Sequence, residues 1–158
     1  MRAIGGSMHG LAHARMFGLA MAMALGAGGA WAASAAQPAE PMALRGVMQQ
    51  MERDKLAAGA ALGQQDWAEL ATRAGRLAHH AEPPLTEKVR ILGWLLTDAP
   101  TFRNHDVQVK AAATDLQAAA QQKDAAAAAS ALQRMQQGCD GCHNSFRDKY
   151  LKRFYDTP

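Results

Sequence analysis

Apolar residues recur every three or four positions along most of this chain, the spacing that places them on one face of an α-helix. This pattern predicts a first helix over about residues 42–61, whose apolar face carries Leu44, Val47, Met48 and Met51. It predicts a second helix over about residues 66–80. Asp66, with Glu69 three residues later, is typical of the start of such a helix.

Two proline-containing segments divide the chain after the second helix. Pro83 and Pro84 end that region, and a short apolar pattern through Val89, Leu92 and Leu96 predicts a short helix before Pro100. We expect the apolar side of this short helix to cover one end of the core. A further helix is predicted over about residues 101–122.

The last predicted helix comes after Asp124, which is placed to act as its N-cap. Its apolar positions alternate in steps of three and four, as in a bundle helix: Ala128, Leu132, Met135, Cys139, Cys142, Phe146 and Tyr150. Gly138 and Gly141 each cost about 1 kcal/mol relative to alanine inside a helix. We interpret these glycines as space for a flat cofactor to approach the backbone.

Strand signals are almost absent, because no sustained alternation of apolar and polar residues occurs. Four principal helices with short connections and one apolar face each predict an all-α fold, an antiparallel four-helix bundle. Residues 42–158 are long enough to form this bundle as a single domain.

Residues 1–32 have the features of a secretory signal peptide. Arg2 and Arg15 precede or flank an apolar stretch, and the sequence Ala-Trp-Ala ending at Ala32 is typical of a cleavage site. The apolar stretch is short for a membrane span of about 20 residues. We therefore expect export with cleavage, and a flexible lead-in over residues 33–41.

Cleavage changes the charge balance of the chain. The full sequence has 17 Lys and Arg against 14 Asp and Glu, a formal net charge of +3. Arg2 and Arg15 supply two of the basic residues, so 15 remain against 14 acids and the net charge falls to +1. This nearly neutral balance does not indicate a nucleic-acid-binding surface, and we expect no nucleic-acid partner.

The only two cysteines form the sequence C-x-x-C-H at Cys139, Cys142 and His143. This motif is the attachment signature of a c-type haem, in which the thiols bond the porphyrin and the histidine binds the iron. In a helix the three side chains lie on one face. A thioredoxin-like dithiol and a zinc site are the alternatives, but the chain lacks a βαβ pattern and a second pair of ligands.

Three histidines outside the motif are predicted to lie at the surface. His79 and His80 end the second helix just before a proline pair, and His105 is similar. Iron ligation by any of the three is not expected. Trp67 and Trp94 are interpreted as core or interface anchors.

The run from Met135 to Arg147 on a C-terminal helix resembles the cytochrome c′ family, and the resemblance extends over nearly the whole of residues 42–158. It implies one covalent haem c attached through Cys139 and Cys142, with His143 as the proximal iron ligand. Predicted export together with the C-x-x-C-H motif fits haem attachment in the periplasm, and we expect a periplasmic location. The first helix is then expected to supply whatever lies on the other face of the iron.

The resemblance leaves the sixth iron position open. Met48, Met51 or neither could occupy it, and the low-spin branch of the family is matched if Met48 is the ligand. Arg147 lies four residues after His143 and is expected on the haem side, where it could pair with a propionate. Arg45 is a further candidate for such a pair.

We expect a one-electron carrier with a single haem and not an enzyme, since no nucleophile–base pair or pair of acid–base carboxylates is evident. The alternative is a five-coordinate haem protein that binds or detoxifies small gases such as NO and CO. Periplasmic redox proteins are the expected partners, and the resemblance makes a homodimer an open alternative. No stable membrane insertion is expected after cleavage.

Overall fold

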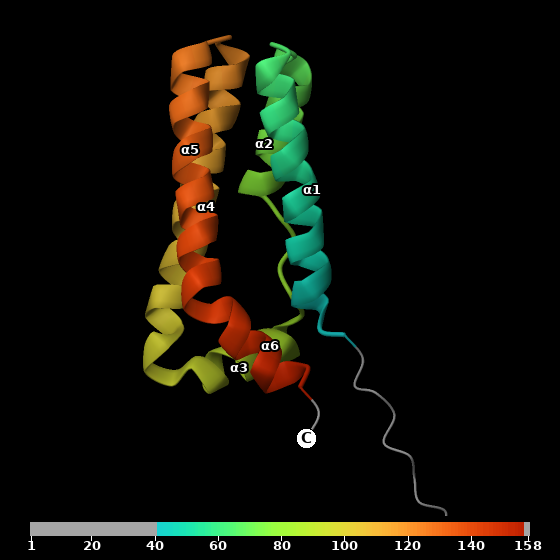
Figure 1. The fold of residues 1–158 in the computed structure, drawn as a ribbon, viewed down its shortest axis with the longest axis vertical. Coiled ribbons are helices and arrows are strands. Elements are labelled where there is room, and N and C mark those ends of the chain that lie inside the picture. The colour runs from blue at the N-terminus through green and yellow to red at the C-terminus, as the bar shows by residue number, and fades with distance from the viewer. Residues whose placement is uncertain (1–40, 157–158) are drawn as a thin grey trace, which may run out of the picture. The chain divides into compact units, whose positions relative to one another are not determined.

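A computed structural model describes residues 41–156, and all regular secondary structure in this range is helical, as predicted (Figure 1). The elements are α1 (Ala43–Gly63), α2 (Trp67–Ala78), α3 (Leu85–Leu95), a 3₁₀ turn (Leu96–Asp98), α4 (Ala99–Gln121), α5 (Ala125–Cys142), a π-helical turn (His143–Arg147) and α6 (Asp148–Phe154).

Four of these helices, α1, α2, α4 and α5, form the predicted antiparallel bundle. The α4 helix packs against both α2 and α5, and α2 packs against α1. Far fewer residues of α1 approach α5, and the two helices are well separated along their lower halves in Figure 1. The bundle is therefore closed on three sides and looser between α1 and α5.

Two tight turns join the helix pairs at the upper end in Figure 1. Gln65 and Lys123 lie in these turns with positive φ values of 55° and 56°, and each is followed by an aspartate. Asp66 Oδ1 accepts a hydrogen bond from the Glu69 backbone N–H at 3.1 Å. Asp124 Oδ1 accepts one from the Ala127 N–H at 3.0 Å. Both predicted helix starts are confirmed.

The core near these turns is built largely from small side chains, and we call this part the closed end. Ala58 from α1, Leu70 from α2, Leu116 from α4 and Ala128 from α5 are all fully buried there. Alanine lets helix axes approach closely, so apolar surface is buried without voids. This packing fixes the positions of all four helices at one end.

The other end of the bundle is covered by α3, α6 and the π-helical turn. Met42, Ile91, Leu95 and Phe146 form a buried apolar cluster at this end. Trp94 packs edge-on against Phe154, with ring centroids 5.4 Å apart. The expectation that the short third helix covers one end of the core is confirmed.

The last helix differs from its predicted form, because the α-helical pattern stops at Cys142. Residues His143–Arg147 form a π-helical turn, which accommodates an extra residue and rotates the face presented by the residues after it. Phe146 within this turn is buried against the α3 cluster. The apolar residues predicted to form a seam from Ala128 to Tyr150 all pack in the buried clusters, although the helix changes from α to π geometry just after the second cysteine.

The signal peptide predicted over residues 1–32 and nearly all of the lead-in predicted over 33–41 lie outside the described residues. Within residues 41–156, none of the helices combines the length and apolar character needed to cross a membrane.

Candidate functional site

A cavity of about 350 Å³ lies between α1 and α5, and the end of α2, α3 and α4 complete its walls. Its lining is mainly apolar, with contributions from Leu44, Val47, Leu77, Ile91, Leu92 and Phe102. The volume falls in the usual range for a small-molecule or cofactor pocket. We call the half of the bundle that contains it the cavity end.

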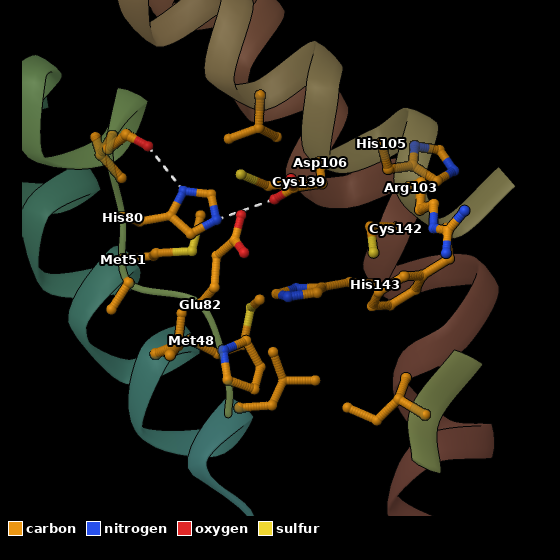
Figure 2. Close-up of a pocket in the computed structure, with 18 of the residues that line it drawn as sticks. Met48, Met51, His80, Glu82, Arg103, His105, Asp106, Cys139, Cys142 and His143 are labelled. Carbon is orange, nitrogen blue, oxygen red and sulfur yellow. Dashed lines mark hydrogen bonds and ion pairs between the residues drawn. The ribbon is translucent and has the colours of Figure 1, made fainter. Parts of the chain in front are cut away.

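The three residues of the C-x-x-C-H motif all line this cavity, as their helical spacing predicts. Cys139 and Cys142 are half-buried on α5. His143 begins the π-helical turn and is exposed, because its ring extends into the open cavity (Figure 2). One wall therefore presents two thiols and an imidazole to the same space.

Two methionines line the cavity from α1 on the opposite side, but their surroundings differ. Met51 packs against the buried cluster that includes Leu77 and Met135. Met48 lines the cavity without belonging to any of the buried apolar clusters among the described residues. Figure 2 shows Met48 and the His143 ring pointing toward one another, whereas Met51 points toward His80.

Burial governs the acidity of the two thiols. It raises the pKa of Cys142 to about 11 and also raises the pKa of Cys139. Both are therefore protonated at neutral pH, unlike the low-pKa thiols of disulfide-exchange sites. Within residues 41–156 no group of three or more His, Cys, Asp or Glu side chains is arranged to hold a metal ion. These observations do not support a disulfide-exchange site or a zinc site at Cys139 and Cys142.

His80 departs from the expected surface position. Its side chain is only 8 % exposed and lines the cavity. Its Nε2 lies 2.9 Å from Asp106 Oδ1, and its Nδ1 lies 2.8 Å from the Leu77 carbonyl oxygen. Since both neighbours are hydrogen-bond acceptors, this geometry favours the doubly protonated ring, in which both nitrogens donate. The bond to Asp106 raises the pKa of His80 despite burial.

His80 lies at one end of a row of charged side chains along this wall. Lys110 Nζ lies 2.9 Å from Asp106 Oδ2 and 3.1 Å from Glu82 Oε1. Lys88 on α3 pairs with the same Glu82 carboxylate. Burial alone would raise the pKa of Asp106, but the bonds from His80 and Lys110 lower it. The sequence did not predict this group, because its members come from the loop after α2, from α3 and from α4.

The other two predicted surface histidines behave differently from each other. His79 is exposed, as expected. His105 is half-buried, lines the cavity and packs edge-on against Phe146, with centroids 6.2 Å apart. Its Nδ1 is buried without a hydrogen-bond partner among the described residues. The surface expectation for His105 is therefore wrong.

The two glycines of the motif region face α4. A β-carbon on Gly138 would lie 2.9 Å from Val109 Cγ2, and one on Gly141 would lie 2.8 Å from His105 Cε1. Real β-carbons do not approach other atoms this closely. The interpretation that these glycines make space for a cofactor is wrong, since their missing side chains let α5 approach α4.

The arginines predicted to meet the cofactor lie away from the cavity lining in the described residues. Arg147 has a 61 % exposed side chain and lies 3.6 Å from Asp148. Arg147 is the last residue of the π-helical turn that His143 begins. Arg45 is exposed and stacks over the Tyr155 ring at 5.6 Å. A propionate contact from either arginine stays a prediction.

The residues present fit a covalently attached haem. A mainly apolar cavity with Cys139, Cys142 and His143 on one wall would provide two attachment points and an axial ligand. The half-buried Met48 on the opposite wall provides a second donor of the type that haem iron accepts. This donor set is typical of a c-type haem and atypical of zinc, which prefers four protein ligands in a closed site.

Comparison with known families gives the same result. The family model described as Cytochrome C′ matches residues 43–147, which span α1 to the end of the π-helical turn. Searches of curated proteins and of solved structures return no match. The family match covers most of the chain and includes the whole C-x-x-C-H motif. The chain therefore belongs to the cytochrome c′ family of c-type haem proteins.

Proposed function

We propose that this protein is a periplasmic one-electron carrier with a single haem c, bonded through Cys139 and Cys142. In this proposal His143 is the proximal ligand and Met48 completes the coordination of the iron. Bound haem would supply the one-electron oxidation and reduction of its iron. The protein would provide attachment, ligation and a low-polarity environment.

The observation that carries the proposal is the difference between the two methionines of α1. Met51 already packs in a buried cluster, so moving its sulfur into the cavity would leave a void there. Met48 points across the cavity toward His143 and contributes to no such cluster among the described residues (Figure 2). Ligation by Met48 therefore requires less rearrangement of the core than ligation by Met51.

Each residue in the proposed site has a distinct task. Cys139 and Cys142 fix the cofactor to α5, so it stays in place in both oxidation states. A thioether from Met48 favours the reduced iron and raises the reduction potential, which suits a carrier. The mainly apolar lining of the cavity would lower the polarity around the iron, which also tunes the potential.

Optical spectroscopy of the reduced protein, with and without CO, separates this function from the gas-binding alternative. We expect a low-spin spectrum that CO leaves unchanged, because Met48 fills the sixth position. A high-spin spectrum that changes at once on adding CO would instead establish a five-coordinate, gas-binding protein.

Mass spectrometry of protein purified from a periplasmic fraction tests export and attachment together. We expect a chain that begins after Ala32 and carries the added mass of one haem. Replacing Cys142 with serine should leave at most one covalent bond, and replacing both cysteines should remove the added mass. A mature chain without added mass would reject the haem proposal.

The proposed partners are periplasmic redox proteins. Lys149, Lys152 and Arg153 are exposed near the C-terminus and could meet an acidic partner, although basic residues also stabilise the last turn of a helix. Sedimentation of the purified protein distinguishes a monomer from the homodimer that the family resemblance suggests.

A further inference from the structure

We propose that Glu87 and Tyr155 are positioning residues, which hold the first turn of α1 and thereby fix where Met48 lies in the cavity. The proposal rests on the proposed function only in its consequence for iron ligation. The attachment of the first turn of α1 by Glu87 and Tyr155 does not depend on iron ligation.

The start of α1 is capped by side chains from distant parts of the chain. Met42 precedes α1 and provides no side-chain cap. The Ala43 N–H donates to Glu87 Oε2 and the Leu44 N–H donates to Glu87 Oε1, each at 2.7 Å. The Met42 N–H donates to the Tyr155 hydroxyl at 3.0 Å. Three consecutive backbone donors are therefore satisfied by α3 and by the residue after α6.

These contacts are of a strong type. A carboxylate at a helix N-terminus accepts charge-assisted hydrogen bonds and also interacts favourably with the helix dipole. Glu87 is half-buried, which reduces the competition from water. Glu87 thus anchors α1 to the α3 and α6 cluster at the cavity end.

The first half of α1 has only partly buried apolar contacts, with Leu44 packed against the cluster of Met42 and Ile91. The buried residues of α1 are Asp54, Ala58 and Ala61, all in its second half. Asp54 is itself fixed to α2, because its Oδ1 lies 2.8 Å from Arg73 Nη1. The segment that carries Met48 therefore lies between two polar attachments, one at Ala43 and Leu44 and the other at Asp54, and Met51 packs against the core between them.

This arrangement has a direct consequence for Met48. The residue lies one helical turn after Leu44 and borders the cavity, where α1 has little packing against α5. If the first turn of α1 is released, that turn can move or unwind without disrupting the closed end of the core. The Met48 side chain would then lose its fixed position opposite His143.

Two conservative variants test the proposal in the haem-attached protein. Glu87→Gln removes the charge and one of the two acceptor oxygens, while Tyr155→Phe removes only the hydroxyl and keeps the ring under Arg45. Asp124→Ala is the matched control. It removes an N-cap from α5, the helix that carries the haem motif, at the opposite end of the bundle.

Two measurements follow the amides of α1 and the Met48 side chain directly and require no CO binding. In Glu87→Gln we expect faster hydrogen exchange at the amides of Ala43 and Leu44, and a shifted or broadened methyl NMR signal from Met48. The methyl signal of the fully buried Met135 should stay in place. Asp124→Ala should change neither the two amides nor the Met48 signal. An unchanged Met48 signal in both Glu87→Gln and Tyr155→Phe would overturn the proposal.

The third measurement is the rate of CO binding to the reduced protein. We expect about a fivefold increase in Glu87→Gln, the size of effect that loss of one helix cap produces, and no change in Asp124→Ala. Equal rates in the wild type and Glu87→Gln, in a protein whose wild-type iron resists CO, would overturn the positioning role. Rapid CO binding by the wild type would instead reject Met48 ligation, and the Met48 methyl signal would then decide the positioning role.

Discussion

The closed end and the cavity end are built from the same four helices, but the side chains between those helices differ. At the closed end Ala58 and Ala128 are fully buried, and the small side chains let α1 and α5 approach. At the cavity end the first half of α1 has no buried residue, and the two helices separate around Met48 and His143. The tightly packed core of small side chains therefore lies at one end of the bundle, and the candidate haem site lies at the other.

The largest effect on this contrast is expected from Leu116→Ala. Leu116 is fully buried at the closed end, so its truncation should lower the free energy of unfolding by about 2–5 kcal/mol. Chemical denaturation of the haem-attached protein measures this loss. The visible spectrum of the folded variant should match that of the wild type. An altered haem spectrum would show that the two ends are not separable in this way.

A smaller change in the free energy of unfolding is expected when either of two glycines is replaced by alanine, and the two changes should have opposite signs. Gly138→Ala brings a β-carbon against the stiff, branched Val109 and should destabilise the protein by about 1–3 kcal/mol. Gly75→Ala meets only the flexible end of Gln117, so it should gain up to about 1 kcal/mol of helix stability. Thermal denaturation of both variants checks the pair. Equal effects would show that the approach of α4 and α5 at Gly138 is not tight.

The smallest effect concerns the charged wall of the cavity and depends on pH. The pKa of His80 is raised in the folded protein, so its protonation stabilises the fold. This contribution to the free energy of unfolding is fully present below the ordinary pKa of 6.5 and is lost as pH rises through the folded pKa. We expect wild type to exceed His80→Gln in stability by about 1 kcal/mol at pH 5.5, since solvent screens the partly exposed Asp106.

This difference should shrink at alkaline pH. The charged groups around His80 are Asp106, Lys110 and Glu82, and the last two keep their charges throughout this range. Denaturation of both proteins between pH 5.5 and 9 provides the measurement. A gap that widens with pH would mean that His80 is neutral in the folded protein.

The contrast between the two ends also separates what sequence could predict from what it could not. Helix positions and the Asp66 and Asp124 caps depend on residues close together in the chain, so local patterns predicted them. The bundle was predictable from the count of helices and their apolar faces. The grouping of Cys139, Cys142 and His143 on one cavity wall was likewise predictable from helical spacing.

The features that were missed depend on partners far away in sequence. Burial of His80 requires Asp106, and the cap on α1 joins Leu44 to Glu87, which is 43 residues later. The apolar pattern placed Met48 and Met51 on one face of a helix, but it could not tell which of them packs in the core. That choice depends on the directions of neighbouring helices, and no local pattern specifies them.

The central claim, that Met48 at the cavity end occupies the sixth iron position, is tested most directly by CO titration of two reduced variants. Met48→Ala should convert the low-spin protein into a high-spin form that binds CO, because the ligand is removed. Met51→Ala should lose stability but remain low-spin and indifferent to CO, since Met51 packs in a buried cluster. The opposite pattern, with CO binding opened by Met51→Ala and not by Met48→Ala, would contradict the account.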